Sequence, residues 1–263
     1  MSRKAQVDKR ERNLVALYRE GERLLQAQIL DAIASGALGT AKYRERRLLV
    51  IQQLLSDVQD QAIPLATKLI AEAYVGGATG SAAATSSVTA SFGTGVHKEA
   101  MNILADNLAN GLNGAAEQVG RRTADLFRRE GLREASGMIA RGAGLTDARG
   151  ALMAALRDQG VTSFIDSAGR AWDLARYSEM VIRTNTADAI IRGNVNQALE
   201  DGYDLTEVLV IDDELLCPIC EPYDGVTYSL TGSTPGYETL DEQPPFHPNC
   251  RCDLNTLASD PRA

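Results

Sequence analysis

Five side chains of the types that bind transition metals lie in two short stretches near the C-terminal end of the chain. The first stretch contains Cys217 and Cys220, separated by two residues. The second follows 26 residues later and contains His247, Cys250 and Cys252. Two cysteines three positions apart can form a tight turn that points both sulfurs at one ion, and a distant loop can supply the remaining ligands of a tetrahedral zinc site. These five residues are therefore candidates for four zinc ligand positions.

Other roles for these cysteines stay open on this pattern alone. Two disulfides would form under oxidising conditions, and buried free thiols would need no metal. A catalytic zinc would need an open ligand position and a nearby carboxylate, for which Glu214, Glu221 and Asp224 are near in sequence. A redox-active Cys-Pro-Ile-Cys pair has thioredoxin-like spacing, but it follows a predicted strand and does not open a long helix.

The composition around the cysteines favours a structural zinc site among these alternatives. Residues 203–256 contain few large apolar side chains and many acidic ones, so a metal could supply folding free energy that a small core cannot. Thiolate and imidazole ligands also suit Zn²⁺ better than Mg²⁺ or Ca²⁺.

Charge is distributed unevenly along the 263 residues, whose net charge is −8. Residues 1–50 hold eleven Lys or Arg and six Asp or Glu, a net charge of +5, whereas residues 201–263 hold two basic and thirteen acidic residues, a net charge of −11. The acidic end would repel phosphate backbones, which argues against a nucleic-acid-binding zinc finger there.

The sequence predicts neither a membrane span nor a secretory signal. No stretch approaches the roughly 20 apolar residues needed to cross a bilayer, and the basic N-terminal residues lack an apolar core. We therefore expect synthesis in a reducing cytoplasm, where cysteine clusters bind metal more often than they form disulfides.

The first 160 residues are predicted to be mainly helical. Apolar residues recur at helical spacing over 14–33 and again over 48–69, where Pro64 is expected to kink or break the helix. Residues 76–96 are uncharged and nearly all small, which predicts a flexible connector. The glycines there are not followed by Gly-Lys-Ser/Thr, which disfavours a phosphate-binding loop. His97 is expected to be exposed.

Helical patterning resumes over residues 99–158, where several glycines are expected either to divide it into short helices or to mark close helix contacts. From residue 160 the pattern changes to a predicted β-hairpin over 161–174, one long helix ending at Gly202, and a strand beginning at Leu205. The predicted fold class is α+β, with a helical region over 1–159 and a small α+β domain, stapled by zinc, over 160–263.

The stretch "CPICEPYDGVTYSL…PPFHPNCRCDL" resembles the C-terminal signature of tailed-phage minor head proteins of the Mu F-type head morphogenesis family. Upstream, "DSAGRAWDL", "RYSEM" and "RTNTADA" also resemble phage minor capsid proteins. The resemblance covers roughly residues 160–256, whereas the first 160 residues match only in helical character.

The resemblance carries over to particular residues. Cys217, Cys220, His247 and Cys250 match the family's metal-like positions, and Cys252 falls at a variable one. The residues that match the upstream signature are Arg170, Trp172, Tyr177, Arg183 and Thr184. We expect structural roles for them, with Trp172 as a core anchor and Arg183 in an internal salt bridge or cap.

The resemblance implies a structural, non-enzymatic virion protein located inside the capsid at the portal vertex. Its implied partners are the portal protein and the major capsid protein, in several copies per virion, and its expected cofactor is one structural zinc ion. The basic N-terminal segment could contact packaged DNA, although a solvated helix face is the commoner meaning of such a segment. The alternatives are a zinc-dependent hydrolase or a toxin-like effector delivered with the phage DNA.

Overall fold

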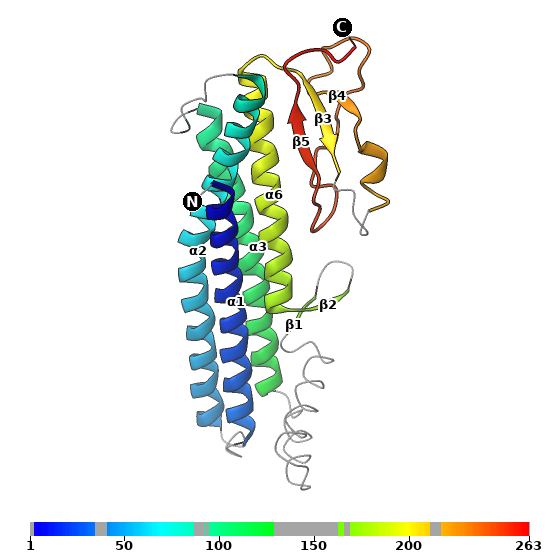
Figure 1. The fold of residues 1–263 in the computed structure, drawn as a ribbon. Helices are drawn as coiled ribbons and strands as arrows, with labels where there is room; N and C mark the ends of the chain where they lie inside the picture. The colour runs from blue at the N-terminus through cyan, green and yellow to red at the C-terminus, as the bar shows by residue number, and fades with distance from the viewer. Residues whose placement is uncertain are drawn as a thin grey trace. The chain divides into compact units, whose positions relative to one another are not determined.

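The computed structural model of the chain describes residues 3–34, 41–86, 92, 95–128, 163–165, 169–210 and 217–262. The described helices are α1 (Arg3–Ala34), α2 (Ala41–Thr85), α3 (Gly95–Arg128) and α6 (Leu174–Glu200), and a short 3₁₀ helix, η2, covers Glu221–Tyr223 (Figure 1). The described strands are β1 (Ser163–Ile165), β2 (Ala171–Asp173), β3 (Leu205–Leu209), β4 (Thr227–Ser229) and β5 (Asp253–Thr256).

Long helices followed by a small antiparallel sheet confirm the predicted α+β class. Within the described part of the chain, no helix combines the length and apolar character that a membrane crossing requires.

The chain forms two compact units that interleave segments from distant parts of the sequence. Unit 1 contains Met1–Arg12, Leu65–Leu108 and Met180–Ala263. Unit 2 contains Asn13–Pro64 and Ala109–Glu179. The division at residue 160, which follows chain order, stays a prediction.

Unit 2 is built on the helical stripes that the sequence predicts. Leu14, Tyr18, Leu25, Ile29 and Ala32 of α1 are buried. Their partners on α2 and α3 are also mainly aliphatic, as expected for amphipathic helices that bury one face. The buried residues of these two helices in unit 2 are Ile51, Leu55, Val58, Ala62, Leu112, Ala115, Ala116, Val119 and Ala124.

The first turn of α6 is held within unit 2 by a carboxylate from α1. Glu22 is buried, and its Oε2 accepts a hydrogen bond from the backbone N–H of Ala175 at 2.9 Å. The first N–H groups of a helix have no intrahelical partner, so an acidic side chain at this position both satisfies a donor and complements the helix dipole.

The predicted hairpin is also present in unit 2. Strands β1 and β2 pair antiparallel, with Phe164 opposite Trp172. Trp172 is half-buried and not part of the core, and it lies between the ring of Tyr177, 6.5 Å away, and the guanidinium of Arg170, 5.7 Å from its centroid. The expectation that Trp172 anchors the core is therefore wrong.

In unit 1, α2 and α6 pack with their backbones in direct contact. A Cβ atom added to Gly77 would overlap the carbonyl oxygen of Ile190, and one added to Gly193 would overlap the carbonyl oxygen of Tyr74. The absence of a side chain at both positions therefore allows an approach that any other residue would block.

The last turns of α2 correct one sequence-based expectation. Residues 76–85 are helical and include the buried Ala78, Ser81, Ala82 and Thr85, so this part of the predicted connector is wrong. Small residues there let α6 approach closely. Residues 87–91 and 93–94 of the predicted connector lie outside the described residues.

Two further expectations about the helices are wrong in part. Helix α2 continues through Pro64, so the proline does not break it, and a kink there stays a prediction. Helix α3 continues through Gly111, Gly114 and Gly120, so these glycines do not divide it, whereas the packing of Gly120 against Leu55 agrees with the expected close helix contacts. The predicted helical residues after Arg128 lie outside the described residues.

His97 is buried, contrary to expectation, with 2% of its side chain exposed. Its Nδ1 lies 2.8 Å from the hydroxyl of Tyr74, and its Nε2 lies 2.6 Å from a carboxylate oxygen of Glu200. Asn196 donates a hydrogen bond to the same Tyr74 hydroxyl at 2.7 Å. These contacts join α3, α2 and α6 within unit 1, because a buried polar group must find a partner to offset its lost hydration.

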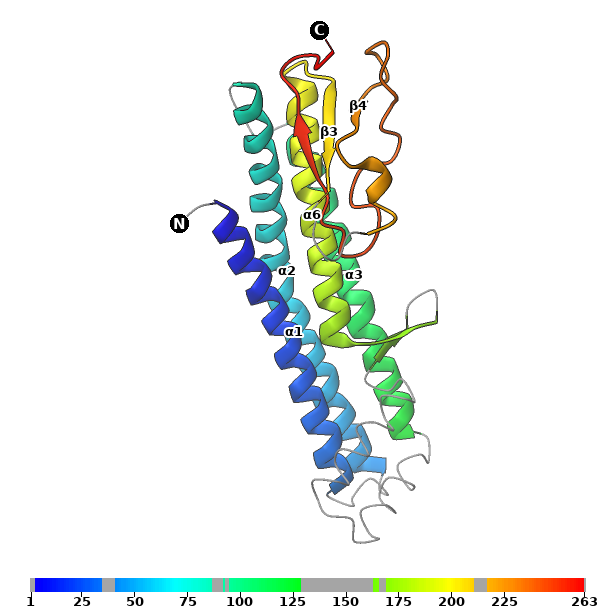
Figure 2. The same cartoon turned by 45° about the vertical axis from the view of Figure 1, so that its right-hand side comes forward.

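The C-terminal sheet has the strand order β4-β3-β5, with both neighbours antiparallel to β3. Strand β5 lies beside α6 in both ribbon views (Figures 1 and 2). The hydroxyl of Thr256 donates to Asn194 at 2.9 Å and lies 2.9 Å from the hydroxyl of Ser81, while Asn194 donates to the Leu254 carbonyl at 3.1 Å. This buried network fixes β5 on α6 and α2.

Asp204 organises the turn after β4. Its carboxylate accepts hydrogen bonds from the hydroxyls of Ser229, Thr231 and Thr234 and from the backbone N–H of Thr231. Desolvation alone would raise the pKa of Asp204, but these donors favour the ionised form and lower its pKa to about 2.

We predict that Gly77→Ala destabilises the protein by about 1–3 kcal/mol, because the added methyl group meets backbone atoms of α6 that cannot move aside independently. Gly80→Ala is the matched control, since it lies on the same helix with nothing within 4 Å of the added Cβ. That variant should gain about 0.5–1 kcal/mol from helix propensity. Urea unfolding followed by circular dichroism measures both. Equal stability of the two variants would contradict the close packing.

We predict that Asp204→Asn lowers the free energy of unfolding by about 1–2 kcal/mol at pH 7, because the amide replaces one acceptor oxygen with a donor. Because the pKa of Asp204 is lower in the folded state than in the unfolded state, its ionised carboxylate stabilises the folded protein at pH values above the unfolded pKa of about 3.9. This stabilisation is lost as the pH falls towards 2. The gap between wild type and variant should therefore narrow from pH 4 to pH 2 in urea titrations. Asp241→Asn, at an exposed position nearby, is the control. A gap independent of pH would refute the carboxylate's role.

Candidate metal centre

The first pair of candidate ligands lies in a tight turn that β3 supports. The carbonyl of Cys217 accepts hydrogen bonds from the backbone N–H groups of Cys220 and Glu221, each at 2.9 Å. Gly225, with φ +67°, then lets the chain turn back so that its N–H donates to the carbonyl of Val208 at 2.9 Å. The turn therefore holds Cys217 half-buried and Cys220 buried next to the sheet.

The second group lies in a four-residue turn that runs from His247 to Cys250. The N–H of Cys250 donates to the carbonyl of His247 at 3.0 Å, and Asn249 has φ +59°. Proline second and asparagine with positive φ third are the features of a type II β-turn. Cys252 follows immediately before β5. The turn thus brings His247 and Cys250 to the same place from positions three apart.

The five candidate side chains meet in space. Cys220 Sγ lies 3.1 Å from His247 Nε2 and 3.8 Å from Cys250 Sγ. The donor atoms form two groups, each lying within 4.8 Å of one another: Cys217, Cys220 and His247 in one, and Cys220, Cys250 and Cys252 in the other. Cys220 belongs to both groups, so it lies at the centre of the cluster.

The sulfurs of Cys220 and Cys250 have the separation of two ligands of a tetrahedral zinc ion. Zinc–sulfur bonds of about 2.3 Å at tetrahedral angles place two sulfurs about 3.8 Å apart, which is the separation between Cys220 and Cys250. All four cysteines are free thiols in the structure. Sulfur and imidazole donors select zinc over the harder divalent cations. When bound, such an ion supplies positive charge and four directional bonds between the two turns.

His247 is oriented as a metal ligand would be. Its Nδ1 lies 2.9 Å from the carbonyl oxygen of Pro248, which can only accept a hydrogen bond, so Nδ1 carries the proton. The lone pair of Nε2 then faces the sulfur of Cys220. A hydrogen bond from the second ring nitrogen commonly fixes the tautomer and orientation of histidine ligands. The backbone of the turn therefore selects the tautomer whose Nε2 can bind a metal.

The thiols differ in their tendency to ionise. Burial raises the pKa of Cys220 to about 11 and also raises the pKa of Cys252. Burial opposes ionisation of Cys250 too, but hydrogen bonds from the backbone and from the thiols of Cys252 and Cys220 lower its pKa below the ordinary value. Cys250 is therefore the thiol among these three that ionises most readily, and metal binding would release protons from the thiols that become ligands.

A cavity of about 210 Å³ opens onto the cluster. None of the described residues that line it is acidic, and the lining side chains are Val210, Cys217, Cys220, His247, Pro248, Asn249, Arg251 and Cys252. The candidate bases Glu221 and Asp224 are exposed, and Asp224 accepts a hydrogen bond from the N–H of Val210 at 3.0 Å. Glu214 lies outside the described residues. Among the described residues, the cavity offers no carboxylate to activate water.

The family model for phage minor capsid protein 2 matches residues 3–251. The chain belongs to that family. The match confirms the resemblance to phage minor capsid proteins and extends it to the first 160 residues, where sequence motifs gave no specific signal. No curated protein and no solved structure matches the chain.

Family membership places this minor capsid protein among structural components of the virion. The matched region includes Cys217, Cys220, His247 and Cys250 and ends one residue before Cys252. Which of the five residues would not bind a metal stays a prediction.

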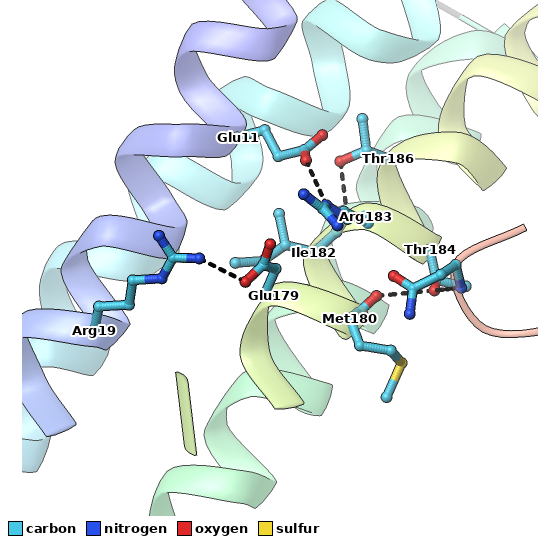
Figure 3. A network of polar contacts seen from close by, with 9 residues as sticks. Glu11, Arg19, Glu179, Met180, Ile182, Arg183, Thr184 and Thr186 are labelled. Atoms are coloured by element: carbon cyan, nitrogen blue, oxygen red, sulfur yellow. Dashed lines mark hydrogen bonds and ion pairs between the residues drawn. The ribbon is translucent and has the colours of Figure 1, made fainter. Parts of the chain in front are cut away.

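Two residues of the upstream signature have identifiable contacts in unit 1 of the minor capsid protein. Arg183 forms an ion pair with Glu11 at 3.4 Å, but 54% of its side chain is exposed, so this is a surface salt bridge and not the expected internal one. The hydroxyl of Thr184 donates to the carbonyl of Met180 at 2.8 Å (Figure 3). Thr184 also accepts a hydrogen bond from the N–H of Asn249, between His247 and Cys250. Sequence reasoning missed this link, and its only signal was the unexplained "RTNTADA" motif.

We predict that Cys220→Ser loses more bound metal than Cys252→Ser, because only Cys220 belongs to both donor groups. Zinc content after gel filtration, measured by atomic emission, should fall to near zero for Cys220→Ser and stay near one ion per chain for Cys252→Ser. Metal loss should also lower stability, by about 2.7 kcal/mol where free zinc is 100 times its Kd. Equal zinc retention by wild type and Cys220→Ser would contradict the central position of Cys220.

Proposed function

We propose that this chain is a structural, non-enzymatic minor capsid protein that associates with the portal vertex and the capsid interior during head assembly. Membership of the minor capsid family over residues 3–251 is the observation that carries the proposal. The long packed helices of the two units support a role in assembly, since they offer rigid surfaces to neighbouring subunits. The small sheet and its turns pack on α6 within unit 1, and one zinc ion would stabilise these turns.

The proposed zinc ligands are Cys217, Cys220, His247 and Cys250. The 3.8 Å separation of the Cys220 and Cys250 sulfurs and the orientation of His247 support this set. Cys252 would then act as a buried neighbour that donates a hydrogen bond to Cys250. The zinc would have a structural role because four protein ligands leave no open position for substrate.

The described lining of the candidate metal cavity, which leaves out residues 211–216, contains no carboxylate and so gives no support to the alternative of a zinc-dependent hydrolase or effector. A catalytic zinc needs an exchangeable water and a nearby general base. Cobalt substitution distinguishes the two cases. We expect the absorption of four-coordinate cobalt with three thiolates and one imidazole, whereas a spectrum that changes on addition of azide would indicate an open position and favour the hydrolase.

Contact between residues 1–50 and packaged DNA has less support. Several basic side chains of this segment already have acidic partners: Arg10 pairs with Glu72, Arg19 with Glu179, Arg23 with Glu20 and Arg47 with Asp31. Paired cations have less charge to offer phosphates, so they release fewer counterions on binding. The proposed partners of the minor capsid protein are therefore the portal protein and, secondarily, the major capsid protein.

Heads assembled with and without the portal protein test the proposed location. We predict that purified heads contain several copies of this chain when the portal is present and lose at least nine-tenths of them when it is absent. Quantitative mass spectrometry against the major capsid protein measures the ratio. Equal incorporation into heads that lack a portal would refute portal association.

A further inference from the structure

The turn that presents His247 and Cys250 has one backbone donor that the turn itself cannot satisfy. In a type II turn, the hydrogen bond runs from the fourth residue to the carbonyl of the first, and here it joins Cys250 to His247 at 3.0 Å. The N–H of the third residue, Asn249, points away from that bond. It donates instead to the hydroxyl of Thr184 on α6 at 3.0 Å.

The hydroxyl of Thr184 is oriented to receive this bond. Its single proton is donated to the carbonyl of Met180 at 2.8 Å, so an oxygen lone pair remains for Asn249. Figure 3 shows Thr184 on α6 with its bond to Met180, next to the passing C-terminal segment. A hydroxyl fixed by its own helix is a better-ordered acceptor than a freely rotating one, because less rotational entropy is lost.

A second bond from the same face of α6 holds the start of this segment. Arg192 donates to the side-chain oxygen of Gln243 at 3.1 Å and is itself held by Asp188 at 3.2 Å. Thr184, Asp188 and Arg192 recur every four residues, so they lie along one face of the helix. This face therefore contacts the segment at Gln243 and again at Asn249, on either side of His247.

We propose that Thr184 is a positioning residue for the metal site: its hydroxyl fixes the turn so that His247 and Cys250 face Cys220. The inference rests on the proposed zinc site. Without the hydroxyl, the N–H of Asn249 would lose its acceptor, and the turn would lose its hydrogen bond to α6. The two ligands would then have to be ordered by the metal itself, which weakens binding.

Thr186 provides a matched comparison on the same helix. Its hydroxyl donates to the carbonyl of Ile182 at 2.7 Å, the same four-residue bond that Thr184 makes to Met180. Thr186 is buried in unit 1, whereas Thr184 is half-buried and contacts the metal-site turn. Replacing Thr186 therefore removes a similar bond without touching the turn.

The test compares Thr184→Val, Thr184→Ser and Thr186→Val in the full-length chain. Zinc affinity is measured by competition with a chromophoric chelator, and ligand geometry by the absorption of the cobalt form. We expect Thr184→Val to bind zinc about 10-fold more weakly, as typical for loss of a hydrogen bond outside the ligand set, and to shift the cobalt bands. Thr184→Ser should restore both, and Thr186→Val should change the unfolding temperature but neither metal property.

The outcomes separate this inference from the proposed zinc site. If wild type and Thr184→Val bind zinc equally and give the same cobalt spectrum, Thr184 does not position the site, although the zinc site stands. If Thr186→Val loses as much zinc affinity as Thr184→Val, the loss comes from general destabilisation of α6, and the inference is overturned. If the wild type binds no zinc, both the zinc site and the inference are wrong.

Discussion

The contact between the backbones of α2 and α6 is the constraint on which unit 1 depends. Gly77 and Gly193 leave no space for a side chain between the two helices, so this crossing tolerates little displacement. Around it lie the buried Tyr74–His97 pair and the Ser81–Thr256 contact, which bring α3 and β5 onto the same helices. Polar groups buried in this way favour one arrangement, because any shift would leave them without partners.

Hydrogen bonds to α6 position the segments that form the candidate metal centre. Strand β5 is held to α6 through Asn194, and the turn before it is held through Thr184. The cysteines also belong to an apolar cluster with Ile191, Val208 and Leu254, where an uncompensated thiolate would be costly. A bound divalent cation would offset that cost, since it neutralises thiolate charge at the place where burial disfavours it.

The sequence contained enough information for the helical stripes, the hairpin, the end of α6 near Gly202 and the convergence of the cysteines and His247. These follow from local rules: apolar periodicity, turn residues and ligand spacing. The prediction failed at residues 76–85, where three glycines, two threonines and a serine lower the helix propensity and no large apolar residue marks a buried face, although four alanines favour a helix. The small side chains of these residues allow α6 to approach closely. The pattern of residues within a single helix does not reveal such a requirement, because it depends on a distant segment of the chain. His97 was misjudged for the same reason, because Tyr74 and Glu200 are distant in sequence.

The interleaving of the two units has a consequence for how the protein is made. Unit 1 uses residues from the first twelve and from beyond residue 180, and contacts such as Glu11 with Arg183 and Ser81 with Thr256 close very long loops. During translation, the first residues of unit 1 are therefore synthesised long before the segments against which they pack. Contacts between residues so far apart in sequence form slowly. Completion of unit 1 is thus a late event in synthesis, because its first residues wait for complementary segments that lie beyond residue 180.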